Sequence, residues 1–292
     1  MLYENPYAGA AGHWIRCNFH THSMEYSVCG SVPMEESIRQ YAAIPSQVLA
    51  LTDHNHISLM TDIQPRFPTL LLLPGFEHSQ ERDMLFVGTR DAVLTTLPLA
   101  EALRQAVGAV TIVCHPDLAP GTEYWSLARI HALPVLPDCL EVYNGHYSTP
   151  RMRGNGGNPR YAHVWDALLT EGCRIWGVGN DDFHDPEDFS NAFTMLMVRE
   201  CNEKAVIDAM KHGHSFASTG LLMRQFRLEA NRIGIETIQP CDGEFIGPGG
   251  AVLAASSGCH FHYSLKGESY VRFEGLGDAG LLFTQPVFRL PE

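Results

Sequence analysis

Short apolar runs alternate with helical patterns from Ile15 to about Gly220, and this alternation restricts the fold more than any other feature of the chain. The runs expected to form strands are 15–19, 48–52, 70–73, 84–87, 110–114, 140–143, 174–178 and 193–198. The segments expected to form helices are 34–43, 99–107, 161–170 and 204–212. Strands that alternate with helices predict a parallel sheet of the α/β class, and seven or eight of them in about 200 residues predict a compact barrel.

The sequence after Gly220 has a different texture, with strand-like runs separated by glycine-rich turns. The runs are 225–230, 251–255, 260–265, 270–273 and 281–287. Residues 247–250 and 275–280 carry the strongest turn signals. We therefore expect residues 1–220 to form the barrel and residues 221–292 to form a small antiparallel C-terminal β domain.

Polar motifs follow the predicted strands, and six of them carry histidine or acidic side chains. They are His20-Thr21-His22, Thr52-Asp53-His54, Gly75-Phe76-Glu77, His115-Pro116, Glu141-Val142-Tyr143-Asn144 and Asp182-Phe183-His184. The carboxyl ends of parallel barrel strands meet on one face, so these side chains are expected to converge. Imidazoles and carboxylates are the ligands of borderline divalent metals such as zinc, manganese and iron. The set therefore predicts a metal site, and with it a hydrolase.

Each motif taken alone also has an ordinary structural explanation. Asp53 would either orient His54 by accepting its second ring N–H, or close a turn by bonding to nearby backbone. Glu77 has two carboxylate oxygens and suits a bridge between two cations, but a glutamate after a strand is more often a solvated loop residue. A single histidine such as His115 is more often a hydrogen-bonded structural residue than a ligand. The metal hypothesis therefore depends on the whole set.

The composition argues against two classes of partner. A formal net charge of -13 argues against broad binding of nucleic acid, which needs basic surface to meet its phosphates, although bound divalent metals would make the site itself positive. No apolar stretch reaches the roughly 18 residues that a membrane-spanning helix needs, and the N-terminus does not read as a signal peptide. The eight cysteines include no CxxC pair, which favours reduced thiols and a cytoplasmic location.

The motifs, taken in order, resemble those of the polymerase and histidinol phosphatase (PHP) superfamily of metal-dependent hydrolases. The matching segments are His20-Thr21-His22-Ser23, Thr52-Asp53-His54-Asn55, Gly75-Phe76-Glu77, His115-Pro116 and Asp182-Phe183-His184. The resemblance covers roughly residues 15–220 and implies a distorted seven-stranded β/α barrel with up to three bound metals. A looser similarity, carried by 165–169, 179–182, 217–220 and 283–286, is to the carbaryl-hydrolase-like branch, which has a C-terminal β segment.

By position, the resemblance implies a ligand set for each metal ion. The first ion would be held by His20, His22, Glu77 and Asp182, the second by His54 and His184, and the third by Glu77 and His115. The implied cofactors are two to three divalent ions of manganese, zinc or iron.

The chain departs from the family pattern at two positions. Cys29 stands where the family often has Asp or His, and it is open to three interpretations: a thiolate ligand, a non-ligand, or the mark of a weakened second site. Asp83 stands where the family often has His, and we expect it to remain a ligand and to favour a harder metal.

Catalysis is expected to involve Asp182, His184 and Glu77, with a hydroxide that bridges two metal ions attacking phosphorus or a carbonyl carbon. The loop 151–160 follows the strand that carries Glu141 and is expected at the same rim. Its three arginines, which would grip a phosphate as planar forks, are Arg151, Arg153 and Arg160. A solvated surface loop explains the same arginines equally well.

These observations predict a metal-dependent hydrolase, and most specifically a phosphoesterase that acts on a small phosphorylated molecule. One alternative is a hydrolase of carbamates or carboxylic esters that uses the same metals. A second alternative is a barrel that binds a metal or ligand without catalysis, which the unusual Cys29 and Asp83 keep open.

Overall fold

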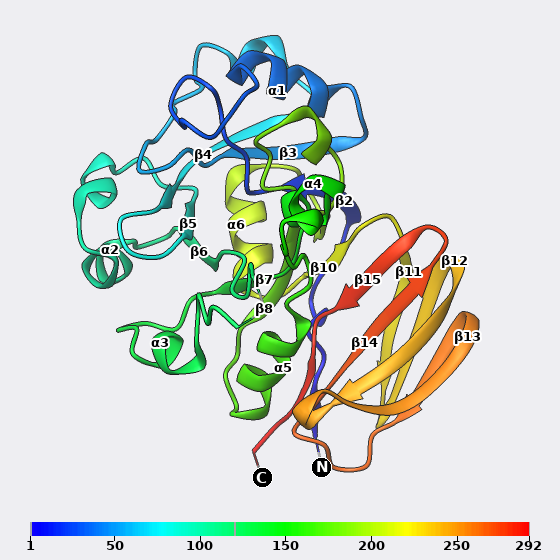
Figure 1. Ribbon diagram of the computed structural model, residues 1–292. Coiled ribbons are helices and arrows are strands. Elements are labelled where there is room, and N and C mark those ends of the chain that lie inside the picture. Colours follow the sequence, from blue (N-terminus) through cyan, green and yellow to red (C-terminus); the bar gives the residue numbers. More distant parts are fainter. Residues whose placement is uncertain (1, 120, 292) are drawn as a thin grey trace.

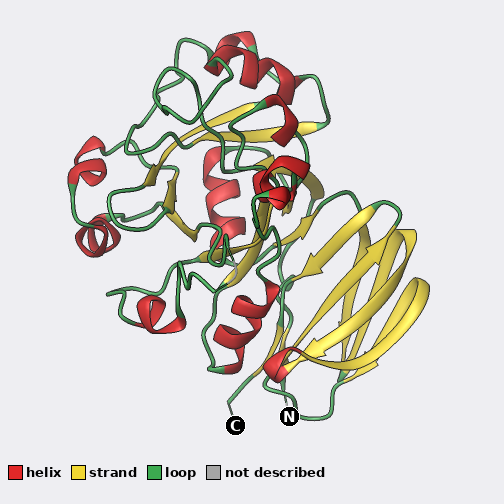
Figure 2. Cartoon of the chain, in the orientation of Figure 1, coloured by secondary structure: helices red, strands yellow, loops and turns green. Residues whose placement is uncertain are grey.

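The computed structural model describes residues 2–119 and 121–291, and it has a mixed α/β fold built around one continuous twisted sheet (Figures 1 and 2). Its first ten strands are β1 (Tyr3–Glu4), β2 (His13–Asn18), β3 (Ser46–Leu51), β4 (Leu71–His78), β5 (Met84–Val87), β6 (Val110–Val113), β7 (Cys139–Asn144), β8 (Trp176–Asn180), β9 (Phe193–Val198) and β10 (Ser215–Ser218). Its α-helices are α1 (Met34–Ala42), α2 (Leu99–Gln105), α3 (Leu127–His131), α4 (Pro150–Gly154), α5 (Ala162–Thr170) and α6 (Glu203–Lys211). Short 3-10 helices are η1 (Gln64–Arg66), η2 (Ala92–Thr96), η3 (His146–Ser148), η4 (Pro186–Asp188) and η5 (Pro248–Gly250).

The strand pairing confirms an α/β sheet with parallel segments. Strands β2, β3 and β4 pair in parallel, and so do β6, β7 and β8. Strands β5 and β9 are antiparallel to their neighbours, so the expectation of a sheet that is parallel throughout is wrong there. The connection from His78 to Met84 is too short for the crossover that a parallel pair requires, which forces β5 to return antiparallel to β4.

The predicted count of seven barrel strands stays a prediction, because β8 ends the hydrogen-bonded strand order. Its Gly179 N–H donates to Thr194 Oγ1 of β9 at 3.1 Å, and Thr194 Oγ1 donates back to the Gly179 carbonyl at 2.8 Å. These two side-chain hydrogen bonds hold β8 against β9. Among the described residues, the two strands form no regular backbone ladder with each other.

The central strands β5 and β6 are buried on both faces. All four residues of β5 and of β6 are buried, as is typical of strands enclosed on both sides. Helix α5 buries Trp165 against this core, and the indole N–H of Trp165 donates to the Ile175 carbonyl at 2.9 Å. The core therefore fixes the strand ends from which the polar motifs project.

The C-terminal strands continue the same sheet, on the side drawn in yellow to red in Figure 1. They are β11 (Met223–Glu229), β12 (Arg232–Gly247), β13 (Ala251–Ser264), β14 (Tyr270–Gly277), β15 (Gly280–Thr284) and β16 (Val287–Arg289), and all of their pairings are antiparallel. Because β15 pairs with β10 and β16 pairs with β1, hydrogen bonds cross the predicted division at residue 220. That division into two domains stays a prediction.

A buried ion pair also joins the C-terminal strands to the helical layer. Arg272 of β14 is 2% exposed, and its Nε and Nη2 atoms donate to the two carboxylate oxygens of Asp166 on α5, each at 2.7 Å. Two further observations concern the described part of the chain as a whole. It contains no helix that is long and apolar enough to span a membrane, and all eight cysteines are free thiols.

Candidate metal centre

The polar motifs meet because the strand pairing continues past the strand ends. A parallel bridge joins Thr21 to Phe183, and a second joins His54 to Glu77. The first bridge joins the segments after β2 and β8, and the second joins the segment after β3 to the end of β4. The Thr52 N–H donates to the Thr21 carbonyl at 2.9 Å and links the two pairs, which is the convergence that the sequence predicts. The structure thus brings His20, His22, His54, Glu77, Asp83, His115, Asp182 and His184 into one connected cluster.

The innermost group contains two histidines and two carboxylates, all of them buried. His20 Nε2 lies 3.0 Å from Asp182 Oδ1 and 3.2 Å from Glu77 Oε1. His22 Nε2 lies 3.2 Å from the same Asp182 oxygen and 3.5 Å from Glu77 Oε2. Four ligand-type side chains therefore face a common point.

Three atoms of this group have no hydrogen-bond partner among the described residues: His20 Nε2 and both carboxylate oxygens of Glu77. They lie within ion-pair distance of one another, but the angles do not suit a hydrogen bond. Buried polar atoms are rarely left in this way, because each costs about 1–3 kcal/mol. Nitrogen and oxygen lone pairs that converge without pairing fit a divalent cation, so the residues present suit the metal that the resemblance implies.

His20 is oriented for this role by the opposite side of its ring. Its Nδ1–H donates to Glu141 Oε1 at 2.9 Å, which leaves the Nε2 lone pair facing Glu77 and Asp182. The other Glu141 oxygen accepts from the His115 backbone N–H at 2.8 Å and from Asn144 Nδ2 at 2.9 Å. A carboxylate behind a histidine ligand is a common arrangement at metal sites.

Two of the ligand-type residues have strained backbones. His115 has φ of 28° and Asp182 has φ of 52°, values that only glycine adopts without cost. Such strain persists where surrounding contacts hold it, and it concentrates at functional sites. The Glu141 bond to the His115 backbone and the Asn144 bond to Asp182 Oδ2 at 3.1 Å supply those contacts.

Opposite charges shift the pKa values of this group strongly. Burial acts to lower the pKa of His20, but the carboxylates around it outweigh burial and raise that pKa well above its usual value. Burial acts to raise the pKa of Glu77, yet neighbouring histidines hold it well below its usual range. The pKa of Asp182 is lowered in the same way, against burial, chiefly by His20 and His184. The carboxylates are therefore ionised and available to a cation.

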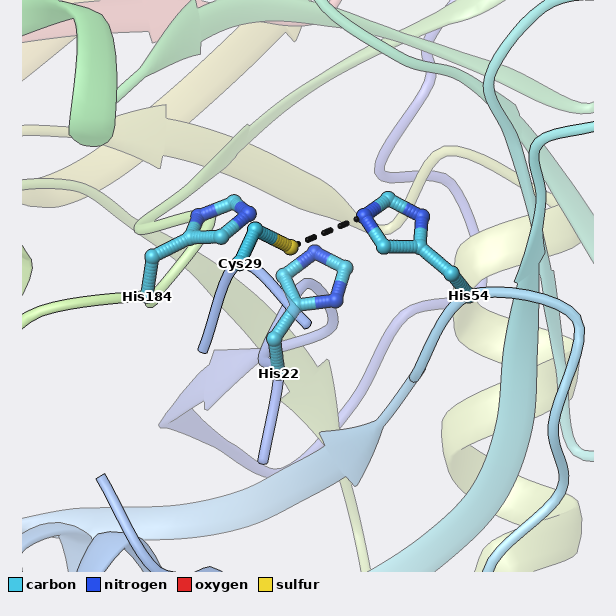
Figure 3. A group of neighbouring side chains, drawn as sticks. All are labelled: His22, Cys29, His54 and His184. Carbon is cyan, nitrogen blue, oxygen red and sulfur yellow. Dashed lines mark hydrogen bonds between the residues drawn. The ribbon is translucent and has the colours of Figure 1, made fainter. Parts of the chain in front are cut away.

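A second group of ligand atoms lies beside the first and includes a thiol (Figure 3). His22, Cys29, His54 and His184 each offer one ligand atom, and these atoms lie within 4.8 Å of one another. His54 Nε2 is 3.1 Å from Cys29 Sγ, and its Nδ1 is 2.8 Å from Glu77 Oε2. Glu77 thus contacts both groups, as a carboxylate that bridges two cations would.

The thiol and the imidazoles shift each other's pKa values. Burial acts to raise the pKa of Cys29, but hydrogen bonds with His184 and His54 lower it to about 6. Burial acts to lower the pKa of His54, while Cys29 and Glu77 raise it to about 11. Burial, reinforced by the charge on His184, lowers the pKa of His22 to about 3.

His115 and Asp83 extend the cluster on the side of β6. His115 Nε2 lies 3.6 Å from Glu77 Oε1 and 3.7 Å from Asp83 Oδ2. Asp83 accepts a hydrogen bond from the Tyr124 hydroxyl at 2.6 Å. These separations are longer than those around His20, so a third ion in this region stays a prediction.

Asp53 does not support His54, although that was one of the two roles considered for it. Its carboxylate accepts from the Ser23 N–H at 2.7 Å and from the Ser27 hydroxyl at 2.7 Å, so it organises the turn that precedes Cys29. His54 Nδ1 instead faces Ser79 Oγ at 2.6 Å. Asp53 therefore joins its own strand end to the segment of Ser23 and Ser27, which differs from both roles considered for it.

The three arginines assigned to substrate binding are all exposed, and two of them contact carboxylates. Arg151 donates to Asp185 and to Glu187, and Arg160 pairs with Glu274. Arg153 lies on the same short helix α4 as Arg151 and has no ion pair in the described part of the chain. Their role in phosphate binding stays a prediction.

A pair beside His184 was absent from the sequence-based site. His146 Nδ1 donates to Asp188 Oδ2 at 3.0 Å, and the His146 ring centroid is 4.6 Å from that of His184. Asp188 is buried and also accepts from the His184 backbone N–H at 2.9 Å. The Gly145-His146 segment directly follows β7, just as the other motifs follow their strands. This position after a strand is the sequence feature that could have identified His146 as part of the site.

Comparison with known proteins supports the fold. No family model matches the chain, and no curated protein matches it. A crystal structure of a two-domain protein from Bacteroides vulgatus ATCC 8482, described as containing a predicted PHP-like metal-dependent phosphoesterase, matches with a TM-score of 0.56 and 18% identity, over 94% of this chain and 95% of that one.

Two further structures match less closely, each over 68% of this chain. PsfC from Pseudomonas syringae PB-5123 has a TM-score of 0.47 at 14% identity over 90% of its chain, and the lesion-specific endonuclease PfuEndoQ from Pyrococcus furiosus has 0.47 at 13% over 56%. The Bacteroides match covers nearly the whole of both chains, so this chain shares the fold of that structure. The PHP resemblance is thereby confirmed at the level of fold, and the comparisons give no support to the carbaryl-hydrolase-like branch.

Proposed function

We propose that this protein is a metal-dependent hydrolase that cleaves phosphate esters of small molecules. The observation that carries the proposal is the set of buried, unpaired ligand atoms on His20 and Glu77, which face Asp182 and His22. A structural role would leave these atoms hydrogen-bonded to each other, whereas a metal role requires them to converge on a shared point.

The residues assigned to the metals extend over the whole cluster. His20, His22, Glu77 and Asp182 would hold one ion, and His54 and His184 would hold a second with Glu77 between the two. When bound, divalent cations lower the pKa of a water nucleophile and neutralise charge on the reacting oxygens. Asp83 and His115 lie where they would extend the site on the β6 side.

The approach to the centre follows from the exposure of its members. The innermost side chains are almost fully buried, but the side chain of His54 is 29% exposed and that of Asp83 is 21% exposed. A substrate would therefore enter on the side of His54 and Asp83 with its phosphate leading. Phosphate is favoured over a neutral ester because the adjacent cations would offset its charge, and because the matched Bacteroides protein is described as a predicted phosphoesterase.

The test combines metal analysis with a substrate panel. Purified protein is loaded with manganese or zinc, its metal content is measured, and it is assayed on an aryl phosphate, an aryl carbamate, a carboxylic ester and a DNA oligonucleotide. The expected result is turnover of the phosphate ester, and chelation of the metal is expected to abolish this turnover. Glu77→Gln is expected to reduce the turnover by at least about a hundredfold. Glu171→Gln, an exposed surface change, is the matched control. Less than one bound metal per chain, or preferred cleavage of the carbamate, would overturn the proposal.

A further inference from the structure

Cys29 lies in a loop that other contacts hold beside His184. The Gly30 N–H donates to the Ser27 carbonyl at 2.9 Å, and the Ser31 N–H donates to the His184 carbonyl at 2.8 Å. The Ser31 hydroxyl also donates to Asp185 Oδ1 at 2.7 Å. The position of the thiol beside the histidines is therefore set by the backbone of its loop, because that loop is hydrogen-bonded to the segment that carries His184.

The three histidines around the thiol each have one ring nitrogen occupied by another partner. His54 Nδ1 is bonded to Ser79 Oγ at 2.6 Å, His184 Nδ1 to the Asp182 carbonyl at 2.8 Å, and His22 Nδ1 to Ser27 Oγ at 3.2 Å. The second nitrogen of each ring is then left to face the cluster. Histidine ligands of metals are held in this way, with one nitrogen fixing the ring and the other binding.

We propose that Cys29, His54 and His184 bind one metal ion through one sulfur and two nitrogens, and that Cys29 is a thiolate ligand of that ion. The proposal rests on the proposed function, because it gives the second ion of that centre its ligands. On binding, the thiol S–H bond breaks, its proton passes to solvent, and the sulfur electron pair forms the metal–sulfur bond without oxidation of any group. His22 lies beside this group, but its single available nitrogen faces Asp182 at 3.2 Å, so His22 belongs with the ligands of the first ion.

The donor set determines which metal this position prefers. A thiolate and two imidazoles suit zinc or a similarly soft divalent ion, with the fourth position left for water, whereas oxygen-rich sets suit manganese and magnesium. The neighbouring group around Asp182 and Glu77 supplies oxygens, so the two positions differ in softness. Cys29 therefore makes the position near His54 and His184 zinc-selective, while the carboxylate-rich position accepts a harder ion.

Cobalt substitution tests the ligand directly and does not depend on activity. Metal-free protein is titrated with Co²⁺ while the near-ultraviolet sulfur-to-cobalt charge-transfer band and the visible ligand-field bands are recorded. The wild-type protein is expected to show the charge-transfer band at a stoichiometry of one band-forming Co²⁺ per chain. Cys29→Ser is expected to lose that band, and Cys201→Ser, which changes an exposed thiol whose Sγ is 3.7 Å from the Gln47 carbonyl, is expected to keep it.

Two more variants keep the result decisive. Cys29→Asp retains a ligand and replaces sulfur with oxygen, so it is expected to keep the metal, lose the charge-transfer band and shift the zinc-over-manganese preference toward manganese by at least about tenfold. Cys114→Ser tests the buried thiol that lies near His20 and Glu77. A band that persists in Cys29→Ser and disappears in Cys114→Ser would overturn the proposal.

The outcomes also separate this inference from the proposed function. Ligand-field bands without a charge-transfer band in the wild-type protein would mean that cobalt binds at nitrogen and oxygen only, which overturns the role of Cys29 and leaves the hydrolase proposal standing. No bound cobalt at all would overturn both.

Discussion

His20 donates through Nδ1 to Glu141 at 2.9 Å, and this bond directs its Nε2 atom toward Glu77 and Asp182. Glu141 is not placed to bind the metal itself, because both of its oxygens accept hydrogen bonds from protein groups. It acts on the centre by fixing the tautomer and orientation of His20 and by holding the strained backbone at His115.

Glu141→Gln is therefore expected to weaken metal binding without unfolding the protein. Loss of the carboxylate behind a histidine ligand typically lowers metal affinity by about 10- to 100-fold. Metal affinity is measured by competition with a chromophoric chelator, and far-ultraviolet circular dichroism reports the fold. Glu171→Gln, which alters an exposed carboxylate near His131, is the control, and equal affinities in the two variants would contradict the role of Glu141.

Metal affinity is expected to weaken in acid. In the metal-free protein burial acts to lower the pKa of His115 and of His184, but nearby acidic groups outweigh burial and raise each of these pKa values to about 9. Both rings are therefore in the charged, doubly protonated form at neutral pH. A metal cation must displace one proton from each ring that it binds, because only the neutral ring offers a lone pair. Affinity is expected to fall by about tenfold per pH unit for each displaced proton as the pH drops below about 9.

Calorimetric titration with zinc in two buffers of different ionisation enthalpy checks this expectation by counting the released protons. An affinity that stays constant between neutral and mildly acidic pH would show that these histidines do not bind the ion.

The strand positions were predictable because each is an apolar run that the core requires. The predicted strands 84–87 and 193–198 coincide with β5 and β9, and the helix predicted at 161–170 begins one residue later as α5. The direction of β5 was missed, because the pattern of apolar residues is the same in either direction. The short connection that precedes β5 is the feature that indicates its antiparallel direction.

The C-terminal strands were harder to predict for a physical reason. The 16-residue strand β12 contains Gly234, Pro240 and Gly243, which disfavour strands, although its buried positions largely alternate with more exposed ones. It forms because β11, β13 and β14 pair with it, which is tertiary information. At the site, motif order identified the ligand-type residues, but the supporting bonds of Glu141 and of Ser27 depend on contacts between distant segments.

Arg153 provides a test of the predicted phosphate contact. Arg151 is engaged by Asp185 and Glu187, whereas Arg153 on the same helix has no ion pair in the described part of the chain. Arg153→Gln is expected to raise KM for a phosphate ester by about tenfold, the value of one charge-assisted hydrogen bond, with little change in kcat. Steady-state kinetics on a charged and a neutral ester measure the effect, with Arg129→Gln as the control. An equal rise in KM for the neutral ester would contradict phosphate recognition.

Arg272 and Asp166 form the buried connection between β14 and α5, and their removal is expected to affect stability rather than metal binding. Arg272→Met leaves the Asp166 carboxylate buried without its partner, which is expected to cost about 3–5 kcal/mol of unfolding free energy. The double variant Arg272→Met with Asp166→Leu removes both charges of this pair, and Glu274, which also contacts Arg272, keeps its ion pair with Arg160, so most of that loss is expected to be recovered. Arg174→Met, which breaks an exposed pair with Glu4, is the control and is expected to cost no more than about 1 kcal/mol. Urea unfolding followed by tryptophan fluorescence measures the stability of all three variants. A double variant as unstable as Arg272→Met alone would mean that packing against Trp165, rather than charge, holds β14 and α5 together.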